Sequence, residues 1–349
     1  MDESPSQTPR RILLIRPSAL GDVCRTVPVL VSLRRAWPHA EIDWLVQDTF
    51  LEAVARHPDL TRAIPFPRAR FGKWWLPWAM RDLALWMREL SDREYDLVVD
   101  CQGLLRSGLI SLATRAGRRV GYANAEEAGW VGLTQRVHVP RDWHAVDRML
   151  ELARAAGAEP VPDLRLYTAR GDREWAAPRA QPEPGAPYAV LAPTSRWPGK
   201  RWPPERFAEL ARRLIGEARF ARVILVGGKR ERDQCGPLLE LGARESRVVD
   251  LIGQTSVGTL MALLETAGLV IANDSAALHM AVGFGRPLVA LYGPTDARRV
   301  GPYGRLNDVL QHAAPGEPLD HKDEKLGRGL MERISIDEVM ARVAVLAGP

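Results

Sequence analysis

Residues 269–291, LVIANDSAALHMAVGFGRPLVAL, hold two short apolar runs with a helical segment between them. The runs at 269–272 and 288–291 have the length and composition of buried strands. Ser275 is a residue type that commonly caps a helix N-terminus, and it predicts a helix over residues 276–283. A strand, a helix and a second strand in this order predict a βαβ unit with parallel strands.

The same alternation extends through the rest of the chain. Further strands are predicted at residues 188–192, 222–226 and 247–251, and in the N-terminal half at 11–16, 41–46 and 97–100. Helices are predicted around residues 257–264, where apolar side chains recur at i, i+3, i+4 and i+7, and at 144–156 and 336–346. The fold class is therefore α/β, with two similar units that bind ligand in a cleft, at the carboxyl ends of their strands.

A proline-rich stretch separates the two halves. Residues 157–187 contain six prolines, and such a stretch is not expected to sustain a long helix. One edge strand is predicted at residues 164–167. The predicted division is an N-terminal domain 1–167, a Pro-rich linker 168–187, a C-terminal domain 188–335 and a terminal helix 336–349.

Composition excludes several classes of protein. The chain has 349 residues, 46% hydrophobic and 26% charged, which argues against wholesale disorder and fibrous structure. No apolar run reaches the roughly 18 residues that a membrane span needs, and residues 1–10 are too polar for a secretory signal. Because Cys24, Cys101 and Cys235 lie far apart, neither a disulfide scaffold nor a cysteine-rich zinc site is expected. A reduced, cytoplasmic protein fits these features.

Positive charge is concentrated in one window of the N-terminal half. The chain carries a net charge of +5, and residues 56–81 alone hold the single acid Asp59 and six cations, Arg56, Arg62, Arg68, Arg70, Lys73 and Arg81. Such a cluster indicates an anionic partner, with a solvated arginine-rich surface as the alternative. No nucleic-acid-binding motif accompanies the charge, which argues against nucleic acid as that partner.

Tryptophans lie in and beside the same window, at Trp74, Trp75, Trp78 and Trp86. Aromatic side chains next to cations suit a membrane interface or stacking on a sugar. Trp74, Trp78 and Trp86 also share helical spacing, which is equally consistent with the buried face of a helix.

Ser18-Ala19-Leu20-Gly21-Asp22 follows the first predicted strand. In a glycine-containing turn at this place, backbone N–H groups and the Asp22 carboxylate would face a ligand. Alternatively, Asp22 only caps the following helix, which Pro28 is expected to interrupt or kink. The segment is neither a GxGxxG fingerprint nor a P-loop, and the missing fingerprint argues against an NAD-dependent oxidoreductase.

Two polar segments follow strands in the C-terminal half. Residues 194–196, TSR, together with Lys200 suit a phosphate group, or they form a solvated turn. Residues 227–231, GGKRE, permit close approach of a ligand to the backbone, and the Glu231 carboxylate is placed to accept hydrogen bonds from ribose hydroxyls. The alternative for the second segment is a plain tight turn.

Residues 273–279, NDSAALH, place Asp274 and Ser275 before a helix N-terminus. Such an end attracts anions through its unpaired N–H groups and its dipole. Taken alone, His279 is better explained as a core histidine than as a ligand-binding one.

In this order, the motifs resemble those of the ADP-heptose:lipopolysaccharide heptosyltransferases, glycosyltransferase family 9. The similarity covers nearly the whole chain. It runs through ILLIRPSALGDVCRTVPVL, EIDWLVQDTF, YDLVVDCQGLLRSG and HAVDRMLELARAAG to VIANDSAALHMAVGFGRPLVALYGPTDARRVGPYG. The last block and the SALGD segment are the most specific.

The resemblance implies a GT-B fold, in which two Rossmann-like parallel-sheet domains face a central cleft. It implies an inverting transfer of heptose from ADP-L-glycero-D-manno-heptose to the lipopolysaccharide inner core, with no metal and no cofactor. The acceptor would bind the N-terminal domain and the nucleotide sugar the C-terminal one. The implied partners are the nucleotide sugar, an anionic lipid A-core acceptor bearing Kdo or heptose, and the inner face of the inner membrane, where a cytoplasmic enzyme would associate peripherally.

The resemblance also implies roles for individual residues. Asp22 would be the general base that takes the proton of the acceptor hydroxyl, and Lys200 would neutralise the donor diphosphate. The implied donor-binding residues are Thr194, Ser195, Arg196, Gly227, Glu231, Asp274, Ser275, Ala276 and His279. The implied acceptor-binding residues are Arg16, Ser18, Gly21, Arg68, Arg70, Lys73 and Gln102.

Two departures from the family pattern keep alternatives open. Glu126 and Glu127 lie near the place where Kdo-specific members carry an arginine, which favours a different acceptor or nucleotide sugar as a second hypothesis. Lys200 follows a connection, WPG, that is one residue longer than in some relatives. A catalytically silent sugar-nucleotide- or lipid-binding protein is a third hypothesis, and the presence of both Asp22 and Lys200 argues against it.

Overall fold

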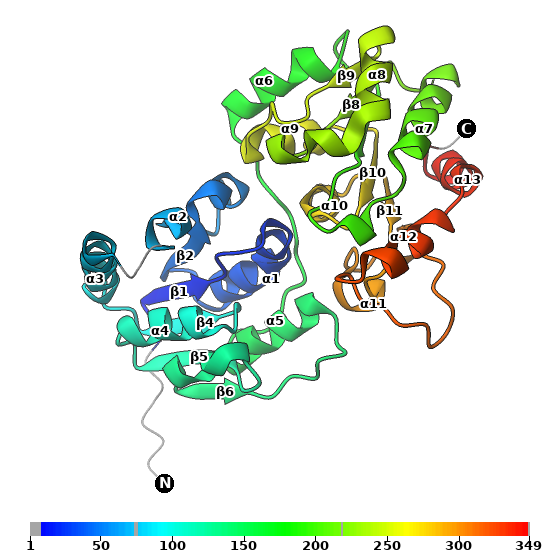
Figure 1. Ribbon diagram of the computed structural model, residues 1–349. Coiled ribbons are helices and arrows are strands. Elements are labelled where there is room, and N and C mark those ends of the chain that lie inside the picture. Colours follow the sequence, from blue (N-terminus) through cyan, green and yellow to red (C-terminus); the bar gives the residue numbers. More distant parts are fainter. Residues whose placement is uncertain (1–7, 73–75, 218, 348–349) are drawn as a thin grey trace. The chain divides into compact units, whose positions relative to one another are not determined.

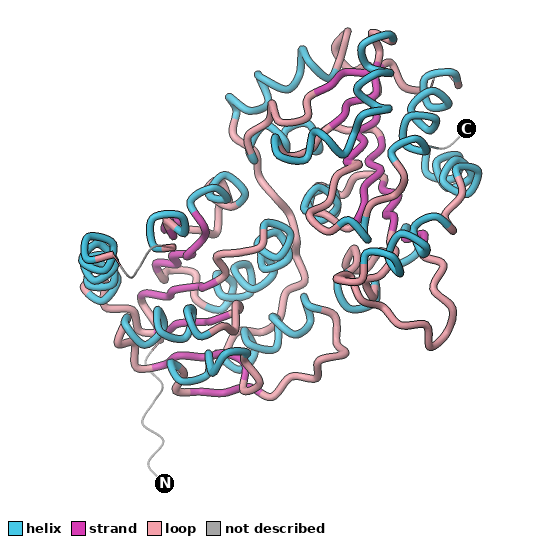
Figure 2. The backbone as a smooth tube through the Cα atoms, viewed as in Figure 1, coloured by secondary structure: helices cyan, strands magenta, loops and turns pink. Residues whose placement is uncertain are grey.

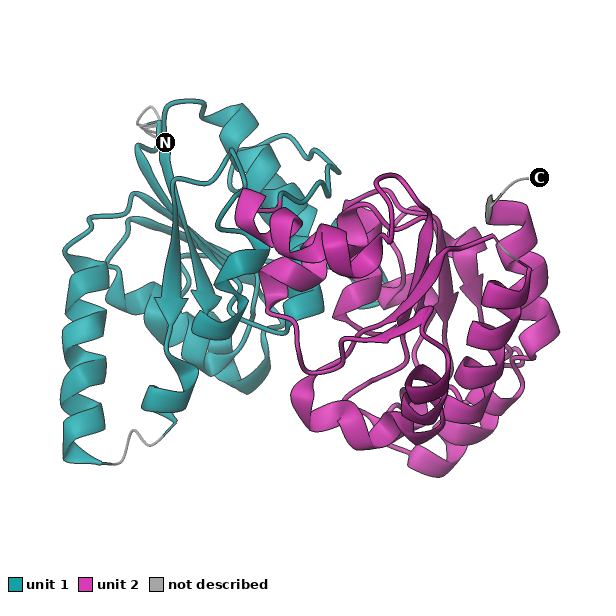
Figure 3. Cartoon of the chain, turned by 90° about the horizontal axis from the view of Figure 1, so that it is seen from above, with its two compact units in different colours: residues 1–167 teal, residues 168–349 magenta. Residues whose placement is uncertain are grey.

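The chain divides into two compact units, Met1–Tyr167 and Thr168–Pro349 (Figure 3). A computed structural model describes residues 8–72, 76–217 and 219–347. Within these residues, each unit is built on one six-stranded sheet whose neighbouring strands are all parallel. Strands and helices alternate along the chain in both units (Figure 2). The predicted α/β class with two parallel sheets is confirmed.

The sheet of the first unit has the strand order β3-β2-β1-β4-β5-β6 (Figure 1). Its strands are β1 Arg11–Ile15, β2 Glu41–Gln47, β3 Arg62–Phe66, β4 Leu97–Asp100, β5 Arg118–Tyr122 and β6 Gln135–Val137. The connections contain α1 Leu20–Ala36, η1 Asp48–Ala53, α2 Arg68–Phe71, α3 Pro77–Ser91, α4 Leu105–Ala113, η2 Glu126–Gly132 and α5 Ala145–Ala155. The three strands predicted here are confirmed to within one residue. β3, β5 and β6 escaped prediction because arginine or proline side chains interrupt their apolar pattern.

Helices cover both faces of this sheet, as is usual when all strands are parallel. Successive side chains of β1 point to opposite faces, so Leu13 and Ile15 join one cluster. That cluster includes Leu90 of α3 and Ile110 of α4. Elsewhere in the unit, α1 packs against α5.

Helix α1 continues through Pro28, so of the two predicted effects, an interruption or a kink, the interruption is wrong. Its residues Val23, Val27 and Leu30 are fully buried. Proline removes one backbone hydrogen bond, whereas burying a large aliphatic side chain contributes about 1.5–3 kcal/mol. The burial of this helix therefore outweighs the lost bond.

The second sheet has the order β12-β11-β10-β7-β8-β9. Its strands are β7 Tyr188–Ala192, β8 Arg222–Leu225, β9 Val248–Asp250, β10 Leu269–Asn273, β11 Leu288–Leu291 and β12 Val309–Leu310. The longer helices are α6 Arg170–Ala180, α7 Pro204–Gly216, α8 Gly236–Arg244, α9 Val257–Glu265, α10 Ala276–Gly283, α12 Glu324–Glu332 and α13 Ile336–Ala347. Shorter helical turns are η3 Pro198–Lys200, η4 Lys229–Cys235, α11 Ala297–Val300 and η5 Leu306–Asp308. The strands predicted in this half are confirmed with small shifts at their ends.

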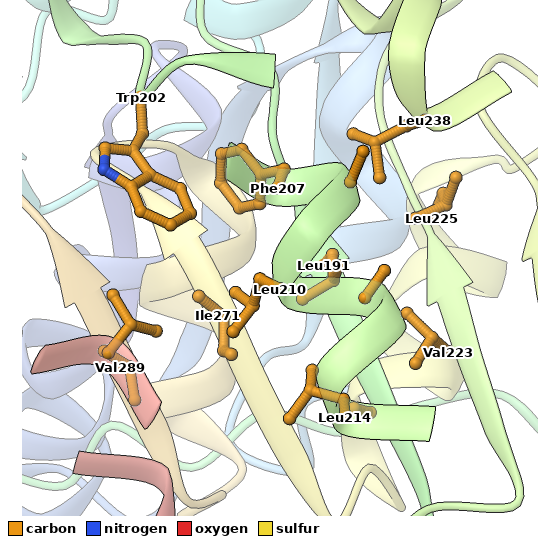
Figure 4. Close-up of a cluster of buried hydrophobic side chains, with 14 of the residues drawn as sticks. Leu191, Trp202, Phe207, Leu210, Leu214, Val223, Leu225, Leu238, Ile271 and Val289 are labelled. Carbon is orange, nitrogen blue, oxygen red and sulfur yellow. The ribbon is translucent and has the colours of Figure 1, made fainter. Parts of the chain in front are cut away.

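The core of the second unit lies between its sheet and α7 (Figure 4). Leu191 of β7 and Ile271 of β10 contribute from the sheet, and Phe207 contributes from the helix. Val339 and Val343 of α13 are fully buried in the same cluster. The terminal helix, which was set apart in the predicted division, is therefore part of the core of this unit.

The stretch predicted as a Pro-rich linker contains a helix, α6. Residues 170–177 are free of proline, and Pro178 falls only in the last turn, so most of the helical hydrogen bonds remain available. α6 packs against α9, and Arg173 pairs with Glu265 at 2.7 Å. The edge strand predicted at residues 164–167 does not form; that segment belongs to neither sheet.

No helix among the described residues is long and apolar enough to cross a membrane.

Candidate active site

In the first unit, β1 and β4 are parallel neighbours, with Ile15 opposite Asp100. The chain leaves both strands at the same edge of the sheet, which places Arg16 next to Cys101. The Arg16 guanidinium donates a hydrogen bond to the carbonyl oxygen of Cys101. Its other terminal nitrogen lies 2.8 Å from Oδ2 of Asp22. Arg16 therefore ties the end of β4 to the first turn of α1.

Asp22 is the third residue of α1, and its side chain serves two purposes. Oδ2 accepts a hydrogen bond from the backbone N–H of Ala19 at 3.2 Å, which caps the helix, and Oδ1 pairs with Arg25 one turn along. Asp22 therefore does cap the helix, as one of the two alternatives expected, and its role toward a ligand stays a prediction.

Two guanidinium groups dominate the ionisation of Asp22. Burial by itself raises the pKa of this carboxyl, but Arg16 and Arg25 lower it further than burial raises it, and the resulting pKa lies far below the usual range. Asp22 is therefore a carboxylate throughout the neutral pH range. A carboxylate with so low a pKa is a weak base.

The turn expected over residues 18–22 ends earlier, because the helix that follows it already includes Leu20. α1 begins at Leu20, so Gly21 lies within the first helical turn. Ser18 donates its backbone N–H to Oε1 of Gln102 at 3.3 Å. The structure thus brings Arg16 next to Asp22 and Ser18 next to Gln102, and the acceptor-binding roles that the resemblance implies for them stay predictions.

A second carboxyl group, Asp100, lies at the same edge and was not among the predicted residues. Its Oδ1 accepts hydrogen bonds from the backbone N–H groups of Gln102 and Gly103, at 2.8 and 3.2 Å. Oδ2 is buried and has no hydrogen-bond partner among the described residues. Burial raises the pKa of Asp100 to about 6, against the smaller lowering by the Ser107 side chain, by the two backbone hydrogen bonds and by Arg16.

Part of the basic window lies on the short helix α2. Arg68 and Arg70 are exposed on α2, and Arg70 pairs with Asp82 at 2.9 Å, which neutralises part of the charge. Lys73, Trp74 and Trp75 lie outside the described residues.

The two remaining tryptophans of this region have different surroundings. Trp86 packs against the aromatic rings of Phe66 and Phe71. Trp78 is 51% exposed. The core interpretation therefore fits Trp86, and the surface interpretation fits Trp78.

In the second unit, Lys200 and Asp274 meet at the carboxyl edge of the sheet. Nζ of Lys200 lies 2.6 Å from Oδ2 of Asp274. The fully buried Asn273 secures this arrangement: its amide donates to the carbonyl oxygen of Pro193, and its oxygen accepts the backbone N–H of Trp202. The segment that carries Lys200 is thereby fixed to the end of β10.

Thr194 and Glu231 form a second pair at this edge. Oγ1 of Thr194 donates to Oε2 of Glu231 at 2.7 Å, and the same oxygen accepts the backbone N–H of Gly228 at 2.8 Å. Gly227 lies against Thr194, and a Cβ atom at Gly227 would approach the threonine Cγ2 to 2.8 Å. Glu231 is thus both the cap of its own turn and a partner of the Thr194 hydroxyl.

Ser195 and Arg196 continue the segment after β7. The backbone N–H of Ser195 donates to Oε1 of Gln234 at 3.3 Å, and Ser195 is buried. Arg196 is exposed, with its guanidinium 5.4 Å from the ring centre of Trp197.

The N-terminus of α10 lies at the same edge as Lys200. Ser275 occupies the N-cap position, but its side chain makes no capping hydrogen bond, and its Oγ is buried without a partner among the described residues. Ala276 opens the helix, and His279 is buried one turn further along. A helix N-terminus next to an ammonium group is suited to bind an anion such as a diphosphate.

Arg25 and Asp100 at the two sheet edges escaped the sequence analysis, and Asn273 and Tyr292 were given no role by it. Arg25 was detectable, since it follows Asp22 by three residues on a helix. Asp100 and Asn273 end strands, a position that marks ligand sites in parallel sheets. Tyr292 approaches Oδ1 of Asp274 to 3.5 Å, and this contact depends on the pairing of β10 with β11.

Chemically, the first unit presents an ionised carboxylate held between guanidinium groups, and the second presents a lysine, hydroxyls and a helix N-terminus. Within residues 8–72, 76–217 and 219–347, no group of three or more His, Cys, Asp or Glu side chains is arranged to hold a metal ion. Each of the two parallel α/β units therefore has a group of polar side chains at the carboxyl ends of its strands, the usual place of ligand sites in such sheets.

Comparison with known proteins gives the family. Residues 83–328 match the model of glycosyltransferase family 9 (heptosyltransferase). The chain is 32% identical over 315 residues to lipopolysaccharide heptosyltransferase 1 of Pseudomonas aeruginosa, a match that covers 88% of this chain and 85% of that protein. The chain belongs to glycosyltransferase family 9.

Solved structures share the fold. The Escherichia coli heptosyltransferase WaaC with ADP superposes with a TM-score of 0.76 at 24% identity, over 97% of this chain and all of that one. The same E. coli protein with ADP-2-deoxy-2-fluoro heptose gives a TM-score of 0.70 at 26% identity, over 93% and 99% of the two chains. The predicted GT-B fold is thereby confirmed.

Proposed function

We propose that this protein transfers heptose from ADP-L-glycero-D-manno-heptose to the lipopolysaccharide inner core, with inversion at the anomeric carbon and without a metal ion. Three features of relatives support the proposal: a family named for heptosyltransferases, a relative named lipopolysaccharide heptosyltransferase 1, and a structure that holds an ADP-heptose analogue. The structural observation that carries it is the placement of Lys200 beside the N-terminus of α10.

The second unit binds the donor in this proposal. Lys200 and the N-terminal N–H groups of α10 neutralise the diphosphate as negative charge builds on the leaving group. Thr194 and Ser195 donate hydrogen bonds to phosphate oxygens, and Glu231 accepts a ribose hydroxyl. A lysine and a helix N-terminus supply here the positive charge that a divalent cation supplies in metal-dependent transferases.

The first unit binds the acceptor. The acceptor oxygen attacks the anomeric carbon from the face opposite the diphosphate, so that the new carbon–oxygen bond forms as the bond to ADP breaks. The proton of the acceptor hydroxyl passes to the Asp22 carboxylate, and ADP departs with the bonding electrons. Arg16 and Arg25 hold Asp22 ionised and oriented, and their positive charge attracts the anionic acceptor.

We further propose that the enzyme is cytoplasmic and associates peripherally with the inner membrane, because its acceptor is a lipid. Arg68, Arg70 and Lys73 are the basic residues that the family resemblance assigns to this acceptor. Each such cation contributes about 1 kcal/mol near an anionic leaflet.

The decisive experiment measures nucleotide release by the purified protein in EDTA, with ADP-heptose, UDP-sugars and GDP-sugars offered on a Kdo-lipid A acceptor. Release of ADP that depends on both ADP-heptose and the acceptor is expected. Turnover of another nucleotide sugar in place of ADP-heptose would overturn the donor assignment, and a strict requirement for a divalent cation would overturn the metal-independent mechanism.

A second candidate is the same chemistry with a different acceptor or nucleotide sugar. The exposed acids Glu126 and Glu127, in η2 of the acceptor-binding unit, favour it because they repel an anionic acceptor. The donor panel above, repeated with heptosylated and Kdo-only acceptors, distinguishes the two candidates.

A further inference from the structure

Residues 311–323 of the second unit, to which the proposed function gives no role, form a connection that leads into α12. Its beginning is held by Gln311, whose side-chain amide donates hydrogen bonds to the carbonyl oxygens of Gly293 and Thr295, at 2.8 and 2.7 Å. Its last residue, Asp323, caps the N-terminus of α12 with its side chain. The connection is therefore fixed to the fold at both ends.

Helix α12 packs on η3, the turn that ends at Lys200. The two backbones are in direct contact, since a Cβ atom at Gly327 would lie 2.5 Å from the carbonyl oxygen of Gly199. A Cβ atom at Gly199 would in turn lie 3.2 Å from the carbonyl oxygen of Asp323. Because Lys200 directly follows Gly199, this contact brings the end of the connection next to the lysine.

His321 lies in the connection just before this contact. Its ring meets the ring of Trp197 edge-on, with the ring centroids 4.9 Å apart. The Arg196 guanidinium lies 5.4 Å from the centre of the same tryptophan ring. Trp197 thus joins Arg196 and His321 in one cluster, and Lys200 is three residues further along the chain.

Four charged groups act on the His321 imidazole. Lys200 and Asp274 belong to the candidate site, and Asp320 and Lys322 are its neighbours in the connection. The two lysines disfavour a positive charge on the ring, and the two aspartates favour it. Burial has the largest effect and Lys200 the next largest, and together they hold the pKa of His321 below its ordinary value.

An anion bound at Lys200 would reverse this balance. It would offset the repulsion between Lys200 and a protonated His321 and add an attraction of its own, and a nearby negative charge raises the pKa of a histidine. No hydrogen bond among the described residues uses the ring nitrogens of His321. A protonated imidazole therefore has two N–H groups to offer to a ligand.

We propose that His321 is a further anion-binding residue of the second unit, which takes up a proton from solvent and binds the diphosphate of the nucleotide sugar beside Lys200. The identity of the anion rests on the proposed function, whereas the cluster itself rests on the contacts of Trp197, Arg196 and His321. In this arrangement Lys200 supplies a permanent charge, and His321 makes donor binding stronger as the pH falls.

The test is calorimetric titration of the full chain with ADP and, separately, with inorganic pyrophosphate. Titration in two buffers that differ in ionisation enthalpy gives the number of protons taken up on binding. At pH 7 the wild-type protein is expected to take up more protons than H321Q, by a fraction of one proton, because one imidazole binds at most one. At pH 6 H321Q is expected to bind ADP about tenfold more weakly, the usual cost of one hydrogen bond to a charged group.

Two further variants are compared with H321Q. H321R carries a fixed charge, and it is expected to bind ADP at pH 8.5 at least as tightly as wild type, without the extra proton uptake. H312Q changes another histidine of the same connection, which pairs with Glu338 at 2.8 Å, and it is expected to match wild type. His279 and the phosphate groups of the ligand are the same in every titration, so their own proton changes cancel in the comparison.

The outcomes separate this inference from the proposed function. Equal proton uptake and equal ADP affinity of wild type and folded H321Q would overturn the role of His321 and leave the proposed function intact. Binding of pyrophosphate that depends on His321, without binding of ADP, would support the anion site and contradict the nucleotide-sugar donor. Binding of neither ligand would contradict both. Circular dichroism checks the folding of each variant; if H321Q is unfolded, the proton uptake of H321R decides.

Discussion

Nζ of Lys200 lies 2.6 Å from Oδ2 of Asp274, and their side chains are only 14% and 12% exposed. The two residues are separated by 73 others in sequence and meet because β7 and β10 are parallel neighbours. A partly buried lysine that is already paired with a carboxylate is held in one position before any ligand arrives. In the proposed function a bound diphosphate shares or replaces this partner, so the pair orients the charge on which the proposed donor binding depends.

Replacing Lys200 by alanine is expected to lower kcat/KM for the nucleotide sugar by about 10²–10³, the usual cost of removing one group that stabilises a leaving group. The measurement is the steady-state rate of ADP release. Lys325, exposed on α12, provides the matched control, and K325A is expected to retain the wild-type rate. A K200A variant within twofold of wild type would exclude the proposed role.

Replacing Asp22 by asparagine is expected to lower kcat by about 10²–10⁴, the range attributed to general acid–base catalysis. Because Arg16 and Arg25 hold the pKa of Asp22 far below the usual range, this residue stays ionised and contributes no decrease in rate between pH 5 and pH 9. The check is a pH–rate profile of the wild-type enzyme together with the rate of D22N. D48N, which changes an exposed aspartate of the same unit, is the control.

Asp100 is expected to make the free energy of unfolding fall as the pH rises, whereas a salt-bridged aspartate makes it rise. Its folded pKa of about 6 lies above the ordinary value of 3.8, so its contribution to stability is present below pH 3.8 and is lost as the pH rises through 6. D100N removes this dependence. From pH 4 to pH 7, the free energy of unfolding of D100N relative to wild type should rise by about 2 kcal/mol. Urea unfolding at the two pH values measures it, and a difference independent of pH would contradict the assignment.

Gly227→Ala is expected to raise the KM for the nucleotide sugar about tenfold, because the new Cβ would lie 2.8 Å from Cγ2 of Thr194 and displace its hydroxyl from Glu231. Calorimetric titration with ADP checks the same effect on binding alone. Gly236→Ala is the control, since a Cβ there meets nothing within 4 Å. Equal affinities for the two variants would show that Thr194 does not contact the donor.

Much of the fold was predictable because strands and helices are determined by short, local sequence patterns. A buried parallel strand is a short apolar run, and β4, β7 and β11 were predicted with both ends correct. Strands with arginine in their pattern, such as β5, were missed because they resemble loops in sequence. α6 was missed because the prolines that flank it dominate the composition of its surroundings, although few fall within the helix.

The sequence predicted where the candidate-site residues lie, but only some of the contacts between their side chains. Parallel strands place their following residues at one edge, and this rule located Asp22, Thr194 and Asp274. The ionised state of Asp22 depends on Arg16 and Arg25 together, and no rule of spacing in the sequence predicts the first of these contacts. The burial of Asp100 likewise became visible only with the packed sheet.

By itself, the sequence determined the alternation of strands and helices, and with it the residues that leave each strand at its carboxyl end. Only the tertiary structure decided which of these residues meet: Arg16 with Asp22, Thr194 with Glu231 and Lys200 with Asp274. It also decided which apolar residues of α3 and α4 remain exposed. The physical reason is that strands form from local apolar patterns, whereas ion pairs and exposure depend on the order of strands in the sheet, which brings together residues distant in the chain.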